Sequence, residues 1–105
     1  MVKVDDWKSP ILVEAILVWT GWGRYFMPRR DDTLIVTHFG AKVASELLPV
    51  IKSIEKEFYA SEAIGTTANL VEMGRMAEED FRKKYPEVAD DIVKALAWCY
   101  TFDFK

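Results

Sequence analysis

The strongest constraint on the fold is the periodic placement of apolar residues between positions 34 and 58. They recur at steps of three or four, which places them on one face of a helix with 3.6 residues per turn. The apolar stripe comprises Leu34, Ile35, Phe39, Val43, Leu47, Val50, Ile51, Ile54 and Phe58, and the opposite stripe comprises Lys42, Glu46, Pro49, Ser53 and Lys56. The pattern predicts one bent helix or two abutting helices over residues 32–60. Asp31 or Asp32 is the expected N-cap, and Pro49 is expected on the solvent side.

An earlier apolar run, residues 11–19, follows Ser9 and Pro10. Serine is a preferred N-cap, and proline is tolerated at the first helical position because its missing N–H is not needed there. The run is short and rich in β-branched residues, so a buried strand is the alternative. The serine–proline start favours a buried helix that ends at Gly21.

Two more helices are expected in the second half of the chain. The first follows a loop with Gly65 as its turn residue and has Thr66 or Thr67 as N-cap. Its inner face comprises Leu70, Met73, Ala77 and Phe81, and its outer face carries Glu78 and Glu79 in i,i+4 spacing with Arg82 and Lys83. Pro86 separates it from the last helix. That helix has acidic residues in its first turn, where the helix dipole favours them, and an apolar face of Val88, Ile92, Ala95, Leu96 and Cys99.

The C-terminal tail fits two periods. Aromatic residues alternate with other residues as in a strand, while the helical period continues to about Phe102. The acidic first turn upstream favours a helix, and a short aromatic extension is the alternative. The whole pattern predicts an all-α bundle of four to five helices in a single domain, residues 1–105.

The composition and charge of the chain favour some classes of partner over others. The chain has 105 residues, of which 50% are hydrophobic and 13% aromatic, so one core is possible without disulfides or metals. The net charge of -3 argues against a nucleic-acid partner. The charge is concentrated in residues 61–105, with six basic and nine acidic side chains, and this favours a partner protein with a basic surface.

Cys99 is the only cysteine, which excludes an intramolecular disulfide. The longest apolar run has nine residues and contains Glu14, which is too short to cross a bilayer, and the N-terminal segment does not resemble a secretory signal. These features predict a cytoplasmic protein with no membrane partner.

Residue patterns for catalysis or metal binding are sparse. His38 is the only histidine, so a nucleophile–histidine mechanism would need it beside Cys99 or a serine, and we expect Cys99 to be an inert core residue instead. One histidine and one cysteine make no structural-zinc set. Adjacent acids, such as Asp90 and Asp91, diverge by about 100° on a helix and do not form an acid–base pair. The sequence therefore predicts no catalytic residue, metal or cofactor.

The segment from Trp19 to Asp32 is the best candidate for a contact surface. It concentrates aromatic rings and three arginines where Gly21, Gly23 and Pro28 prevent a regular helix. In the functional interpretation, a set of rings and guanidinium groups projects to bind an acidic or aromatic ligand: Trp22, Arg24, Tyr25, Arg29 and Arg30. In the structural interpretation, Trp19, Phe26 and Met27 pack under the bundle, and Arg29 and Arg30 pair with Asp31, Asp32 or the acidic helices.

The sequence thus predicts a small non-enzymatic protein-binding module, such as an inhibitor, an adaptor or an immunity-type protein. The predicted contact residues are Trp22, Arg24, Tyr25, Arg29, Arg30, Glu78 and Glu79. The alternative is a small-molecule-binding protein or enzyme subunit with an aromatic pocket between helices. Self-association into a homo-oligomer is also open.

Overall fold

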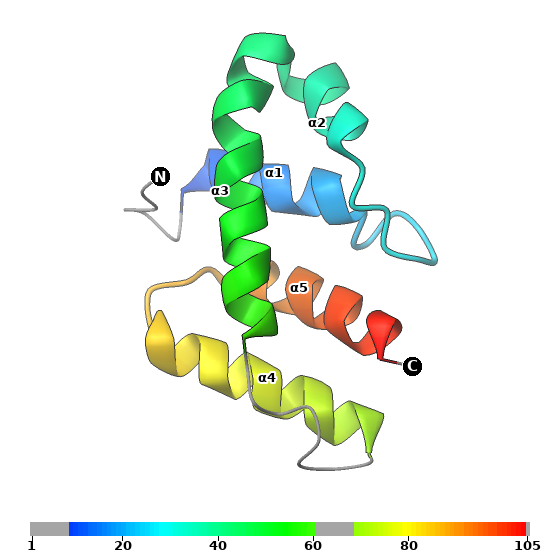
Figure 1. Cartoon of the computed structure of the whole chain (residues 1–105), viewed down its shortest axis with the longest axis vertical. Coiled ribbons are helices and arrows are strands. Elements are labelled where there is room, and N and C mark those ends of the chain that lie inside the picture. The colour runs from blue at the N-terminus through cyan, green and yellow to red at the C-terminus, as the bar shows by residue number, and fades with distance from the viewer. Residues whose placement is uncertain (1–8, 61–68, 105) are drawn as a thin grey trace.

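The computed structural model describes residues 9–60 and 69–104, and this part of the chain contains five helices and no strand. The helices are α1 (Pro10–Thr20), α2 (Asp32–Phe39), α3 (Ala41–Tyr59), α4 (Leu70–Lys84) and α5 (Asp90–Asp103) (Figure 1). The prediction of an all-α bundle of four to five helices is confirmed.

Three of the helices are stacked and a fourth crosses them. In Figure 1, α1, α5 and α4 lie one below the other, and the long α3 runs across all three. The short α2 turns back beside the upper end of α3. The loop between α1 and α2 and the end of α5 lie on the same side of the stack. This side carries the candidate site described below.

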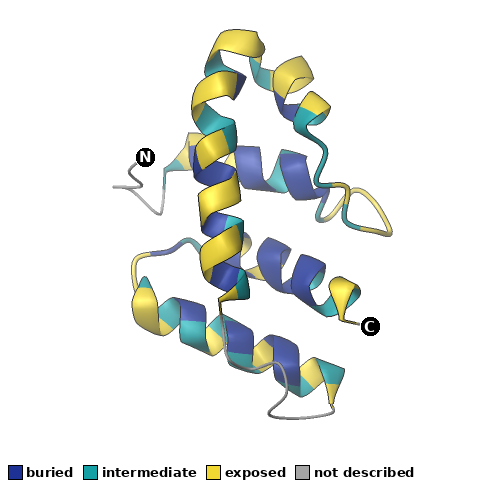
Figure 2. Ribbon diagram, in the orientation of Figure 1, coloured by how far each residue is buried: buried dark blue, intermediate teal, exposed yellow. Residues whose placement is uncertain are grey.

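The core is built from the apolar faces that the helical periods predict. Figure 2 shows the buried residues on the sides of the helices that face one another. The α3 stripe buries Ile51, Ile54 and Phe58, and its predicted polar stripe is exposed. The ring of Phe58 lies 5.2 Å from that of Phe81 on α4 and 5.8 Å from that of Tyr100 on α5, which joins three helices through aromatic contacts.

Of the two alternatives predicted for residues 32–60, the structure has two abutting helices, and the break is at Gly40. This residue has φ +87°, a left-handed conformation that interrupts the helix and that glycine adopts at little cost. Pro49 lies inside α3 on the exposed side, as predicted. Asp31 is the N-cap of α2, and its carboxylate accepts a hydrogen bond from the Thr33 N–H at 2.9 Å.

The ends of the other helices agree with the predictions in part. The run after Pro10 is a helix, not a strand, although the Ser9 side chain makes no capping hydrogen bond. The N-cap of α4 is Asn69, whose side chain accepts from the Glu72 N–H, and the predicted loop and caps at Gly65, Thr66 and Thr67 lie outside the described residues. Finally, α5 continues to Asp103, so the helical interpretation of the aromatic tail is confirmed.

At Gly74, α4 packs closely on α5. A Cβ atom at this position would lie 2.6 Å from the Cγ2 of Thr101, well inside van der Waals contact. The two helices therefore need a residue without a side chain here. None of the described helices is both long and apolar enough to cross a membrane.

Candidate functional site

The loop between α1 and α2 has a defined shape because its backbone is hydrogen-bonded to itself. The Gly21 carbonyl accepts from the N–H groups of Arg24 and Tyr25 at 3.0 and 3.1 Å. The Arg29 N–H donates to the Thr20 carbonyl at 2.8 Å, which joins the two ends of the loop. Gly21 itself has φ +80° and caps α1. Residues between these contacts are therefore presented on a closed loop.

The base of the loop is anchored in the core. Trp19 is 3% exposed, and its indole Nε1 donates to Asp32 Oδ1 at 3.1 Å. Lys52 Nζ on α3 donates to the other Asp32 oxygen at 2.8 Å. These two hydrogen bonds lower the pKa of the Asp32 carboxyl. Trp19 therefore has the structural role that the sequence suggested.

The tip of the loop is exposed, whereas the structural interpretation predicted that its apolar side chains pack under the bundle. Phe26 is 101% exposed and Met27 58% exposed, so neither side chain packs under the bundle. Tyr25 is also exposed, and the guanidinium carbon of Arg29 lies 4.8 Å from the centre of its ring. The reason is the turn at Gly21 and Gly23, which directs residues 25–27 away from the core.

Arg30 is not available to a partner, because its guanidinium group binds the end of α5. Nη1 and Nη2 donate to the two carboxylate oxygens of Asp103 at 2.6 and 2.7 Å. Nη1 also lies 3.3 Å from the Tyr59 hydroxyl and 3.7 Å from Glu55. Arg30 has the left-handed φ of 47°, which is unfavourable for a residue with a side chain. Arg30, one of the predicted contact residues, thus forms an internal ion pair with Asp103, the Arg30–Asp103 clamp.

The clamp predicts a specific acid sensitivity. Hydrogen bonds from Arg30 lower the pKa of Asp103, although partial burial opposes them. In the unfolded chain the pKa of an aspartate is about 4. The contribution of Asp103 to stability is therefore complete above that pH and is lost as the pH falls through the lower pKa of the folded state. Because Asp103 is exposed and water screens its charge, Asp103→Asn should cost about 1 kcal/mol at pH 7 and less at acid pH, as measured by urea unfolding.

Glu55 provides the matched control for this prediction. It lies in the same cluster, but burial raises its pKa, so its ionised form disfavours folding at neutral pH. Glu55→Gln should leave the stability at pH 7 unchanged or slightly higher. An equal loss in both variants would contradict the assignment of the clamp to Asp103.

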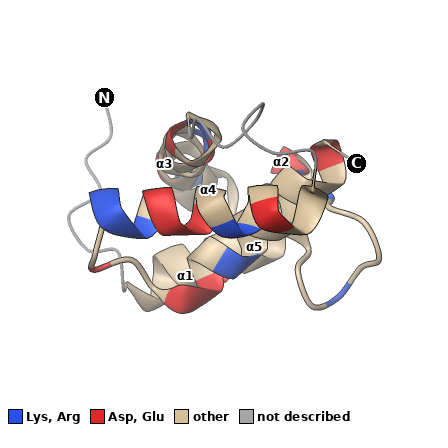
Figure 3. Ribbon diagram, turned by 90° about the horizontal axis from the view of Figure 1, so that it is seen from below, with Lys and Arg blue, Asp and Glu red and all other residues tan. Residues whose placement is uncertain are grey.

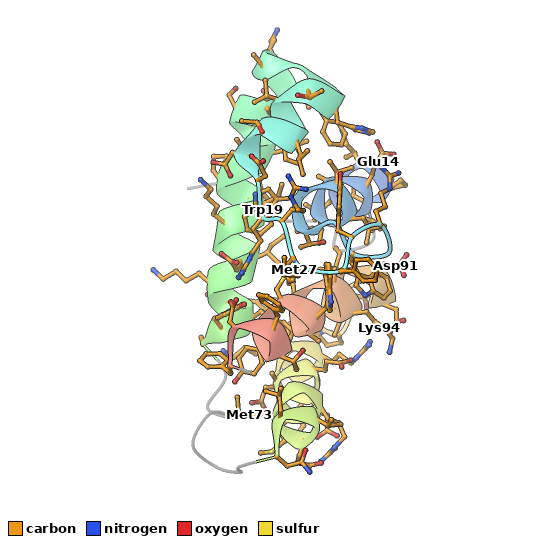
Figure 4. The ribbon with its side chains drawn as sticks, turned by 90° about the vertical axis from the view of Figure 1, so that its right-hand side faces the viewer. Glu14, Trp19, Met27, Met73, Asp91 and Lys94 are labelled. Atoms are coloured by element: carbon orange, nitrogen blue, oxygen red, sulfur yellow. The ribbon has the colours of Figure 1, made fainter. Side chains whose placement is uncertain are left out.

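Next to the loop, two adjoining hollows form an apolar groove over α4 and α5. One has a volume of about 510 Å³ and the other about 390 Å³, and both are lined by Leu70, Trp98 and Thr101. Figure 4 turns this side to the viewer and shows Met27 on the loop above α5. We define the apolar groove by its large side chains: Trp22, Phe26, Met27, Leu70, Val71, Trp98 and Phe102.

The three glutamates of α4 that form ion pairs share two arginines of the same helix, and one of these, Arg82, also binds Asp90 on α5. Glu79 and Glu72 both bind Arg75, and Glu78 lies 3.8 Å from Arg82. The predicted pairing of Glu78 with Arg82 is therefore confirmed, whereas Glu79 pairs with Arg75. Figure 3 shows these positive and negative residues interspersed along α4. Glu78 still lines the groove, while Glu79 does not line it.

A third hollow, of about 580 Å³, lies along α1 and shares Trp22 with the apolar groove. Arg24 and His38 line it, and His38 Nε2 lies 2.6 Å from Glu14 Oε2. His38 is exposed and Cys99 is buried, as expected of a surface residue and a core residue. Burial raises the pKa of the Cys99 thiol to about 12, so this thiol is protonated at neutral pH.

No group of three or more potential metal ligands occurs among residues 9–60 and 69–104. Besides the loop and the three hollows, a further hollow of about 390 Å³ lies between the end of α3 and α4, where Glu57, Asp80 and Lys84 line it. All three hollows are open grooves on the surface.

The sequence did not point to the α4 and α5 residues of the apolar groove. Val71 on α4 is 80% exposed. Its position as a single apolar residue beside the charged face of the helix was a sequence signal that could have indicated a contact surface. Trp98 and Phe102 were visible only as part of the aromatic tail. Asp103 also gave a signal, because a carboxylate at the C-terminal end of a helix is disfavoured by the helix dipole and needs a cation nearby.

Comparison of the chain with protein-family models, with curated proteins and with solved structures finds no match. The function is therefore inferred from the geometry of the loop and the groove, which are both built from residues that the structure describes.

Proposed function

We propose that the protein is a small binding module that recognises another protein through the loop tip and the apolar groove. The supporting observation is the exposure of Phe26 and Met27 on a loop whose backbone is hydrogen-bonded into one shape. A large apolar side chain on a loop that is already ordered loses less conformational entropy on binding than one on an unordered loop. Aromatic side chains also dominate the binding energy of protein interfaces.

The neighbouring surface extends this contact area. Val71 is 80% exposed, and Trp98 and Leu70 are half-buried beside it. Exposed apolar surface that continues from one element to the next is typical of interaction sites. Open grooves of this kind suit a protein surface better than a small molecule, since small ligands usually bind where most of their surface is enclosed.

Site-specific photo-crosslinking in the native cells tests this proposal. A photoreactive phenylalanine analogue at position 26 should cross-link a protein, whereas the same analogue at position 104 should not. Phe104 is 40% exposed at the end of α5 and does not line the groove. Comparable cross-linking at both positions, or no protein cross-linked at position 26, would refute the proposal.

A competition assay with two matched valine variants shows whether the groove takes part. Unlabelled wild-type protein and the Val36→Glu variant should compete with the labelled protein and suppress the cross-link at position 26. Val71→Glu should compete at least about tenfold less well. The reason is that binding would bury its unpaired carboxylate in the interface, which costs well over 1.4 kcal/mol of binding free energy. Both valines are exposed, at 42% and 80%, so neither variant should change the melting temperature. Equal competition by Val71→Glu would exclude the groove.

A further inference from the structure

Resting on the proposed function, we propose that Met27 is an oxidation site that controls binding at the loop tip. Hydrogen peroxide converts its thioether into a sulfoxide, and the loop tip then presents a polar group beside the apolar groove. The proposal follows from the exposure of Met27, from the protection of the other described sulfur atoms, and from the place of Met27 in the wall of the groove.

The sulfur-containing residues of the described ranges differ in their access to solvent. Met27 is 58% exposed, whereas Met73 is 7% exposed in the core and Met76 is half-buried on α4. Cys99 is buried, and burial raises the pKa of its thiol, so the reactive thiolate is scarce at neutral pH. A dissolved oxidant therefore reaches the Met27 thioether more readily than the other sulfur atoms of residues 9–60 and 69–104.

The reaction needs only the thioether and the peroxide. The sulfur lone pair attacks one oxygen of hydrogen peroxide, the O–O bond breaks and an S–O bond forms. The sulfur loses two electrons, the peroxide gains them, and the departing oxygen leaves as water after taking the proton of the new S–O–H group. The product, methionine sulfoxide, is polar, and methionine sulfoxide reductases return it to the thioether.

Met27 lies where such a change affects the binding surface. It lines one hollow of the apolar groove together with Trp98 and Phe102, and Figure 4 shows it on the loop above α5. The Thr101 hydroxyl in the same hollow already donates to the Ala97 carbonyl at 3.0 Å. A partner that covers this hollow would remove water from the sulfoxide oxygen, and burying a polar group that gains no hydrogen bond lowers affinity about tenfold or more.

The fold should not respond to the same oxidation. Met27 is neither in the hydrophobic core nor packed against it. The backbone hydrogen bonds that close the loop are donated by Arg24, Tyr25 and Arg29, and a sulfoxide at position 27 leaves these groups unchanged. Loss of binding at an unchanged melting temperature therefore distinguishes a change of the surface from unfolding.

Peroxide treatment of the whole protein tests the inference. Peptide mass spectrometry should show one added oxygen atom at Met27 before Met73 or Met76 gains one. As an unlabelled competitor, the treated protein should suppress the cross-link at position 26 about tenfold less well than the untreated protein does, and methionine sulfoxide reductases should restore its competition.

Two leucine variants provide the controls, and each is compared with its own untreated sample. Peroxide should not change the competition by Met27→Leu, because leucine has no sulfur to oxidise. Met76→Leu removes a half-buried sulfur outside the groove, and its competition should fall on treatment as that of the wild type does.

Two results would overturn the inference while the proposed function stands. Oxygen added to Met73 or Met76 as readily as to Met27 would exclude the assigned site, and undiminished competition by protein oxidised at Met27 would exclude the control of binding. A cross-link at position 26 that does not form even with untreated protein refutes the proposed function, and the control of binding then fails with it.

Discussion

Replacing Gly21 with alanine should destabilise the protein by roughly 2–4 kcal/mol and disorder the loop. Alanine at φ +80° carries a backbone cost of roughly 1–2 kcal/mol. Its Cβ would also lie 2.5 Å from Tyr25 Cδ2 and 3.1 Å from Arg29 Cγ, and relieving such an overlap costs roughly 1–3 kcal/mol more. The side chains of Tyr25 and Arg29 would have to shift, and we expect this shift to weaken the hydrogen bond from Arg29 to Thr20 that closes the loop.

Gly23→Ala is the matched control for this prediction. Its φ of +86° carries the same backbone cost, but nothing lies within 4 Å of the added Cβ. Urea unfolding should therefore show a smaller loss for Gly23→Ala, and hydrogen exchange at the Arg29 amide should accelerate in Gly21→Ala alone. An equal loss in both variants would show that the contact with Tyr25 contributes nothing.

Gly74→Ala should destabilise the contact between α4 and α5 by about 1–2 kcal/mol. Alanine is about 1 kcal/mol better than glycine inside a helix, so the packing clash must exceed this gain. The Cγ2 of Thr101 cannot turn away cheaply, because the threonine hydroxyl donates to the Ala97 carbonyl at 3.0 Å. The helices must separate instead, which also widens the groove that Gly74 and Thr101 line.

The double variant Gly74→Ala/Thr101→Ser separates the clash from other effects. Serine keeps the hydroxyl and removes the Cγ2, so adding Gly74→Ala to Thr101→Ser should be neutral or stabilising by up to about 1 kcal/mol. Urea unfolding of the four proteins gives the coupling between the two positions. Additive losses would mean that the close approach in the structure is not what limits residue 74.

The periodic patterns predicted the helices and their buried faces, because amphipathic spacing depends only on residues close in sequence. The stripe that ends at Phe58 and the inner face from Met73 to Phe81 are buried as predicted. The break between α2 and α3 was placed less well. The pattern did not locate a break within residues 32–60, whereas in the structure the left-handed Gly40 separates the helices and Pro49 lies inside α3.

The candidate site was predicted only in part. Trp22, Arg24, Tyr25 and Arg29 lie on a surface loop, where the last three are exposed and Trp22 is half-buried. The sequence could not show that Arg30 binds Asp103, since the two residues are 73 positions apart and meet only after α5 packs below α1. It also could not show that Glu79 pairs with Arg75, because Arg75 and Lys83 both lie four residues from Glu79 on the same helix face.

Local spacing by itself thus determined the all-α class, the core faces and the irregular loop, since each depends on contacts within a few residues. Tertiary packing decided which side chains the loop exposes, which charges pair between helices and where the apolar groove lies. The apolar groove exists only where the loop, α4 and α5 come together, and no single stretch of sequence contains it. Long-range contacts are required for it, and helical periodicity carries no information about them.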